Sequence, residues 1–253
     1  MSRVVAVHSY RGGTGKSHFT ANLATAVAMQ GRRVGVVDAD LPSPGIHNLF
    51  ALDVERVPTT LNHYLWGECP IGGSAYEVTQ SIGLNGSGRV WLVPSSVRAD
   101  DIARILKDSY DLKRLNDGLR SLAKDLALDF LFIDTHPGLS NEALLSIALA
   151  NQVILVLRPD KQDYQGTAVT IDVARQLKVR NMMLAINKVH RKLNMIELKA
   201  RVEEIYEVPV AGVFPLSEEV AQLASEGIFC INHHDHPISR ELHRIAGRLL
   251  ESA

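Results

Sequence analysis

The sequence predicts an α/β fold: a single doubly wound, mainly parallel β-sheet flanked by helices, in one domain that spans residues 1–253. Short β-branched runs alternate along the chain with longer amphipathic stretches. Some of the short runs are apolar at every position, as at 153–157, which is typical of parallel strands that are covered on both faces. A glycine-rich turn also separates the first such run from the first long helix.

Seven strands are expected from the β-branched and apolar runs: Arg3–His8, Val34–Asp38, Val90–Pro94, Phe130–Asp134, Gln152–Leu157, Met182–Asn187 and Val210–Phe214. Eight helices are expected from the amphipathic stretches: Lys16–Gln30, Ala99–Lys107, Leu112–Ala127, Asn141–Ala150, Gln165–Leu177, Met195–Tyr206, Glu218–Ser225 and Ser239–Glu251. Residues 67–89 are rich in Gly and Ser, and we interpret them as a surface excursion, because the strand–helix order resumes at Val90.

The composition excludes several classes of protein. With 27 Lys and Arg against 28 Asp and Glu, the net charge of −1 argues against a uniformly basic nucleic-acid coat. The two cysteines, Cys69 and Cys230, lie too far apart for a disulfide scaffold or a zinc ribbon. The first apolar run is too short for a signal peptide, and no run is long enough to span a bilayer. We therefore expect a cytoplasmic protein.

The strongest motif lies between the first expected strand and the first expected helix. It consists of Arg11, Gly12, Gly13, Thr14, Gly15, Lys16 and Ser17. Glycines allow consecutive backbone N–H groups to turn towards phosphate oxygens, and the helix N-terminus adds unsatisfied donors. In this arrangement Lys16 is placed to hold the β- and γ-phosphates, and Ser17 to bind Mg²⁺.

Carboxylates follow two other expected strands. Asp38 and Asp40 are two residues apart on an extended segment, so their side chains point the same way. Asp134 ends the apolar run 130–133. Ligands of doubly wound sheets lie beyond the carboxyl ends of the strands, so these acids are expected beside the phosphate loop.

The loop resembles the deviant Walker A motif of the MinD/ParA family of ATPases, in which a Lys occupies the position of Arg11. Further resemblances follow in the family order: Asp38-Ala39-Asp40, Asp134-Thr135-His136-Pro137-Gly138, Asn187-Lys188 and Gly212-Val213-Phe214-Pro215. They extend from Val4 to about Leu250. The resemblance implies a P-loop NTPase fold, ATP and Mg²⁺ as cofactors, and a homodimer that forms with ATP.

The resemblance also implies roles for individual residues. Arg11 would reach the phosphates of a second copy, and Asp40 would orient the attacking water, so that the catalytic set is Lys16, Asp40 and Arg11. Mg²⁺ would be bound by Ser17, with Asp38 nearby and Asp134 acting through water. Nucleotide contacts are expected from Gly12, Gly13, Thr14, Gly15, Lys16, Ser17, His18, Gly138, Asn187 and Pro215. His136 replaces a family proline, and a proton relay there is the alternative to an ordinary loop residue.

Two weaker patterns concern partners. The segment 175–201 holds eight basic residues and one acid, which suits non-specific DNA, a solvated surface, or an acidic protein or lipid surface. The eight are Arg175, Lys178, Arg180, Lys188, Arg191, Lys192, Lys199 and Arg201. The C-terminal helix 239–251 is amphipathic and basic, but it aligns with the family's last core helix, so we expect core packing rather than membrane binding.

These observations predict a MinD/ParA-like ATPase that acts as an ATP-dependent dimerisation switch. Its hydrolysis would be slow and stimulated by an unknown protein partner, and its task would be to position or partition a cargo such as DNA, protein machinery or a surface complex. One alternative is an ATP-gated binding module with negligible turnover. Another is a P-loop biosynthetic enzyme of the ligase or amidase type. Iron–sulfur carriers are disfavoured because the cysteines they need are missing.

Overall fold

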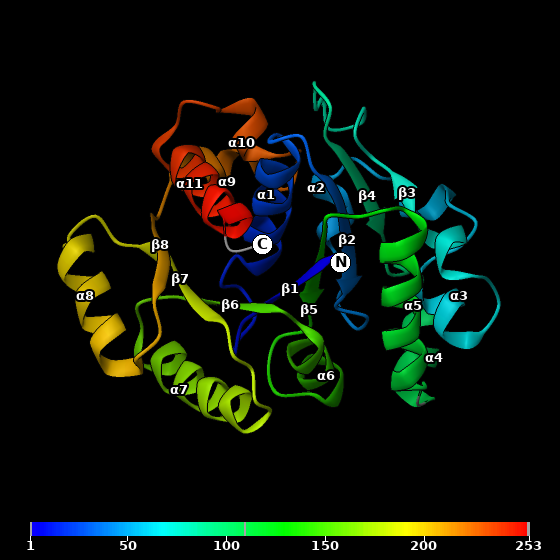
Figure 1. The fold of residues 1–253 in the computed structure, drawn as a ribbon, viewed down its shortest axis with the longest axis horizontal. Helices are drawn as coiled ribbons and strands as arrows, with labels where there is room; N and C mark the ends of the chain where they lie inside the picture. The colour runs from blue at the N-terminus through cyan, green and yellow to red at the C-terminus, as the bar shows by residue number, and fades with distance from the viewer. Residues whose placement is uncertain (1, 109, 252–253) are drawn as a thin grey trace.

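The computed structural model describes residues 2–108 and 110–251. Its eight-stranded sheet has the order β3-β4-β2-β5-β1-β6-β7-β8 (Figure 1). All neighbouring strands are parallel except the β3–β4 pair. The strands are β1 (Arg3–His8), β2 (Arg33–Ala39), β3 (Tyr76–Glu77), β4 (Arg89–Val93), β5 (Phe130–Thr135), β6 (Gln152–Leu157), β7 (Met182–Val189) and β8 (Val210–Pro215). The predicted fold class is confirmed.

Helices cover both faces of this sheet (Figure 1). They are α1 (Lys16–Ala28), α2 (Ile46–Leu49), α3 (Leu61–Trp66), α4 (Ala99–Lys107), α5 (Leu112–Asp125), α6 (Asn141–Leu149), α7 (Lys161–Gln176), α8 (Met195–Tyr206), α9 (Glu218–Leu223), α10 (Phe229–Asn232) and α11 (Pro237–Glu251). Two 3₁₀ turns, Val54–Arg56 and Ile71–Ser74, lie between β2 and β3. No helix in the described ranges is both long enough and apolar enough to cross a membrane.

Alternate residues of each central strand enter different cores, as the pleat requires. Val5 and Val7 of β1 pack into the core beneath α1, α10 and α11, whereas Ala6 belongs to the core beneath α7 and α8. A third cluster lies under α3 and α5. In the C-terminal helix α11, Leu242, Ile245 and Leu249 are buried, so its apolar side packs into the core as expected.

The structure corrects several boundaries. The excursion 67–89 is not purely irregular, because Tyr76–Glu77 pairs with β4 as an antiparallel edge strand. The segment between β2 and β3 also contains short helices that were not expected. Helix α7 begins at Lys161, four residues earlier than predicted, because the side chain of Asp160 accepts the N–H groups of Gln162 and Asp163 and caps it.

The parallel strands carry the predicted site to a single edge of the sheet. Asp38 lies beside Asp134 in the register of β2 and β5, and β1 lies directly against β5. The loop after β1 therefore emerges next to both carboxylates. Strands β7 and β8, which end near Val189 and Pro215, supply neighbouring positions at the same edge.

Candidate functional site

The loop between β1 and α1 forms an open cradle. Gly13 and Gly15 have φ values of 78° and 90°, in the left-handed region that favours glycine. A Cβ added at Gly12 or Gly13 would meet no atom within 4 Å, so this side of the loop is free. Helix α1 begins at Lys16 and directs its first unsatisfied N–H groups to the same place. The loop thus has the space and the donors that a phosphate chain requires.

A buried ion pair lies at the base of this cradle. The Nζ of Lys16 is 2.8 Å from Oδ1 of Asp134, and the hydroxyl of Thr20 donates to the same oxygen at 2.9 Å. The other oxygen, Oδ2 of Asp134, is buried and has no hydrogen-bond partner within the described residues. Ser17 is half-buried on the first turn of α1. A buried carboxylate oxygen without a partner suits a water-bound Mg²⁺.

The two carboxylates after β2 have different surroundings. Asp38 is fully buried and accepts the N–H groups of Asp40 and Gly45. Burial, reinforced by the nearby Asp134, raises the pKa of Asp38 to about 8. Asp40 is nearer to solvent, and its Oδ1 lies 2.6 Å from Nδ1 of His136. Burial raises the pKa of Asp40, and this hydrogen bond opposes the rise.

A second histidine, which the sequence did not single out, lies beneath the site. His8 is fully buried at the end of β1, and its Nδ1 is 2.7 Å from Oγ1 of Thr135. The hydroxyl of Thr135 donates to the carbonyl of Val7, so Nδ1 of His8 is the donor to Thr135. Burial lowers the pKa of His8 to about 3, with a smaller contribution from Lys16. The sequence gave no sign of this contact, because a histidine that ends an apolar strand has no distinguishing pattern.

Arg11 does not face the cradle in this structure. Its guanidinium forms ion pairs with Asp160 at 3.1 Å and with Asp163 at 3.0 Å, and it donates to Gln162. Arg158 binds the same two carboxylates at 3.1 and 3.3 Å. Two arginines and two acids at the start of α7 thus form a closed cluster. The expected contact of Arg11 with a second copy requires the side chain to leave this cluster.

Two predicted nucleotide contacts are occupied by the protein itself. The side-chain amide of Asn187 donates to the carbonyl of Thr14 at 2.8 Å and accepts the N–H of Lys188. Asn187 therefore holds the phosphate loop against the end of β7. The N–H of Gly138 donates to the carbonyl of Ser9 at 3.0 Å and ties the loop after β5 to the segment before the cradle.

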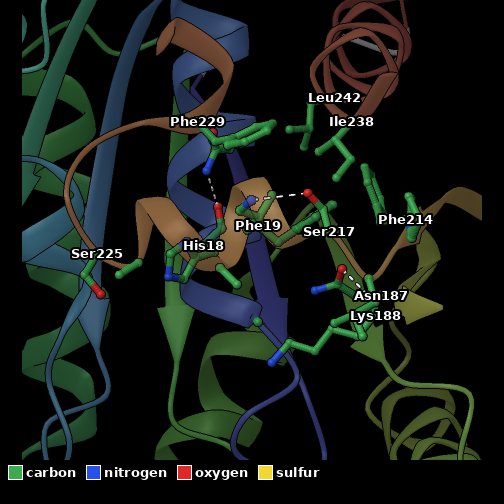
Figure 2. Close-up of a pocket in the computed structure, with 17 residues that line it drawn as sticks. His18, Phe19, Asn187, Lys188, Phe214, Ser217, Ser225, Phe229, Ile238 and Leu242 are labelled. Carbon is green, nitrogen blue, oxygen red and sulfur yellow. Dashed lines mark hydrogen bonds between the residues drawn. The ribbon is translucent and has the colours of Figure 1, made fainter. Parts of the chain in front are cut away.

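A cavity of about 320 Å³ opens beside the cradle (Figure 2). Figure 2 shows His18, Phe19 and Phe214 around its centre, with Asn187 and Lys188 at the end nearest the loop. Pro215 also lines it, together with residues of α9, α10 and α11. Its largely apolar wall and its place next to the phosphate cradle suit a nucleotide base. Burial is the main cause of a lowered pKa for His18, whose ring lines the cavity.

The basic segment 175–201 is divided by the fold. Arg175, Lys178 and Arg180 precede β7. Lys188 lies at the carboxyl end of β7, and Arg191 lies just beyond it. A strand of eight residues extends over about 25 Å, so the two groups lie at opposite edges of the sheet. Arg175 is further engaged by the carbonyl of Tyr206. Lys199 and Arg201 lie on α8, which returns from one of these edges to the other.

Comparison with protein families agrees with this geometry. Residues 5–229 match the family described as CobQ/CobB/MinD/ParA nucleotide binding domain. The chain belongs to this family. The resemblance noted in the sequence is thereby confirmed, and members of the family bind nucleotides through the domain that this chain contains.

Individual relatives extend the comparison. An uncharacterized ATP-binding protein of Methanocaldococcus jannaschii is 29% identical, over 99% of this chain and 88% of its own length. An iron–sulfur cluster carrier protein of Aquifex aeolicus is 28% identical, over 97% of this chain and 66% of its own. The structure of MinD from Pyrococcus horikoshii with Mg-ADP superimposes with a TM-score of 0.81 at 22% identity, covering 98% of this chain and 96% of that one. At that identity the likeness demonstrates the shared fold.

Proposed function

We propose that this family member hydrolyses ATP and that it acts as an ATP-dependent dimerisation switch. The observation that carries the proposal is the convergence of the open cradle, Lys16 and the carboxylates of Asp40 and Asp134 at one edge of the sheet. The cavity beside it supplies space for a base. These are the parts that phosphoryl transfer to water requires: a phosphate clamp, a cation site and a group that orients the nucleophile.

The residues fit a Mg²⁺ ion. The free Oδ2 of Asp134 and the hydroxyl of Ser17 would hold it, partly through water, and buried Asp38 lies close by. The ion would neutralise charge on the β- and γ-phosphates. Since Lys16 is paired with Asp134 in the present structure, its ammonium must turn to the phosphates when nucleotide enters.

The protein's own groups then have separate tasks. The N–H groups of the loop and Lys16 bind and orient the phosphates. Asp40 accepts a hydrogen bond from the attacking water and aligns it. Arg11, once released from Asp160 and Asp163, stabilises charge across the dimer, a role that elsewhere is worth about 10³–10⁵ in rate. Turnover then depends on a rearrangement, so we infer slow hydrolysis that a protein partner in the cytoplasm accelerates to release a positioned cargo.

The proposal is tested by ATP binding, single-turnover hydrolysis and oligomeric state. Lys16→Ala should abolish ATP binding. Asp40→Ala should bind ATP and Mg²⁺, stop hydrolysis and accumulate as a dimer in light scattering. If Asp40→Ala hydrolyses ATP at the wild-type rate, the water-orienting assignment is wrong. If the wild type binds no ATP, the whole proposal fails.

One alternative has support from a specific contact. Because Arg11 is engaged by α7, a chain that binds ATP without measurable turnover would also fit the structure. Single-turnover assays of wild-type protein with and without cell extract separate the two functions, since only the switch should hydrolyse its bound ATP when a partner is supplied. A ligase or amidase would instead need a carbon substrate. In that case the small-molecule fraction of a cell extract should stimulate ATP hydrolysis.

A further inference from the structure

The loop from β7 into α8 exposes an unusual set of side chains. All of residues 190–197, which we name the 190–197 tip, are exposed. Leu193, Met195 and Ile196 have 44%, 42% and 82% of their surface accessible. Elsewhere in the described ranges, exposed large apolar residues occur singly along the sequence. A cluster of three within four residues indicates a surface that contacts something.

The tip is held in shape and projects outwards. The side chain of Asn194 accepts the N–H groups of Ile196 and Glu197 and caps α8, which fixes the first turn. None of the three apolar residues lines the cavity beside the cradle. Figure 1 shows the loop at the upper end of α8, at the left of the view. The three apolar groups are therefore exposed on a turn of fixed shape.

The charge of the tip is complementary to anions. Arg191 and Lys192 are exposed beside the apolar cluster. The only acid between positions 188 and 199 is Glu197, whose carboxylate accepts a hydrogen bond from the side chain of Asn194 at 2.9 Å. Basic side chains around a projecting aliphatic cluster are the combination with which proteins attach to the interface of an anionic bilayer.

We propose that the 190–197 tip inserts Leu193, Met195 and Ile196 into the surface of an anionic lipid bilayer. This goes beyond the ATPase role and needs neither nucleotide nor turnover. A DNA backbone would take up the charges of Arg191 and Lys192 but would leave Ile196 in water. Helix α11 is unavailable for this task because its apolar side chains are buried.

The test is flotation of the full chain with vesicles of phosphatidylcholine, with or without phosphatidylglycerol. Wild type should float only with the anionic vesicles. Met195→Ser/Ile196→Ser should weaken binding about tenfold or more, and Lys192→Glu about fivefold or more. The matched controls are Ile205→Ser, which alters a 61% exposed residue at the far end of the same helix, and Arg180→Glu at the opposite sheet edge. Both controls should bind as wild type does.

Insertion is distinguished from adsorption by a reporter in the tip. The fluorescence of Ile196→Trp should shift to the blue with anionic vesicles, whereas a tryptophan placed at Ile205 should not. Absence of flotation overturns the proposal, as does equal loss in the tip and control variants. Binding of the wild type to duplex DNA and its self-association are measured as well. If Met195→Ser/Ile196→Ser abolishes either of them while flotation persists, the tip belongs to that other partner and the proposal is overturned. ATP hydrolysis, measured without vesicles, should be unchanged in every tip variant.

Discussion

Nδ1 of His136 lies 2.6 Å from Oδ1 of Asp40, which joins the loop after β5 to the loop after β2. In the related family motif a proline stands where this chain has His136, so the contact belongs to this chain. The hydrogen bond fixes the carboxylate that we propose to orient water. His136 is thus a positioning residue, and it acts on chemistry only through Asp40.

Removing this contact should slow hydrolysis without weakening nucleotide binding. We expect His136→Ala to lower kcat by about tenfold to a hundredfold, because a misplaced orienting group loses alignment. KM for ATP should stay near the wild-type value, since the phosphates are held by the loop and Lys16. His136→Asn, which retains a donor, should recover part of kcat. An unchanged kcat in His136→Ala would show that Asp40 keeps its orientation unaided.

Loss of Lys16 should be more severe than loss of Arg11. Lys16→Ala removes the cation of the cradle and leaves the buried Asp134 without its ion-pair partner. We expect calorimetry to detect no ATP binding by Lys16→Ala. Arg11→Ala should bind ATP with nearly wild-type affinity, because its guanidinium rests on α7, but its turnover should be lower. Equal losses of affinity in the two variants would place Arg11 in the cradle.

The cluster around Arg11 should contribute unequally to stability. The side chain of Asp163 is 1% exposed, and it meets both Arg11 and Arg158. We expect Asp163→Asn to lower the free energy of unfolding by about 1–3 kcal/mol. Asp160 is 41% exposed, and Asp160→Asn keeps a side chain that can cap α7. We therefore expect Asp160→Asn to lower the free energy of unfolding by less than about 1 kcal/mol. Urea denaturation of both variants measures the difference, and a larger effect at Asp160 would contradict this ranking.

Stability should fall on acidification through His8. Its pKa is about 3 in the folded protein against 6.5 for the free side chain. Between these values the unfolded chain binds the extra proton, so lowering the pH favours unfolding by up to about 1.4 kcal/mol per pH unit. The contribution is fully present above pH 6.5 and is lost towards pH 3. Melting curves of His8→Asn should show a flatter dependence, whereas exposed His234→Asn should behave as wild type does.

Much of the fold was predictable because burial on both faces leaves continuous apolar runs. Each of the seven parallel strands overlaps an expected strand, and the glycine loop and the carboxylates fall where strand ends must place them. The strand Tyr76–Glu77 was missed because a two-residue edge strand has no periodicity to detect. The cluster of Arg11 was also missed, since its partners lie about 150 positions away and ion pairing over such separations leaves no local pattern. Asp160 was the one available sign, as an acid in a helix-capping position.

The nucleotide site and the turn between α7 and β7 lie at opposite ends of the parallel strands, and this separation has a practical consequence. Every residue proposed for the nucleotide site lies near or beyond the carboxyl ends of the strands, whereas the turn 177–181 connects α7 to the amino end of β7. A fluorophore or affinity tag in that turn would sit remote from both the cradle and the 190–197 tip. The protein can therefore be labelled or immobilised through the turn 177–181 while the cradle and the 190–197 tip stay accessible.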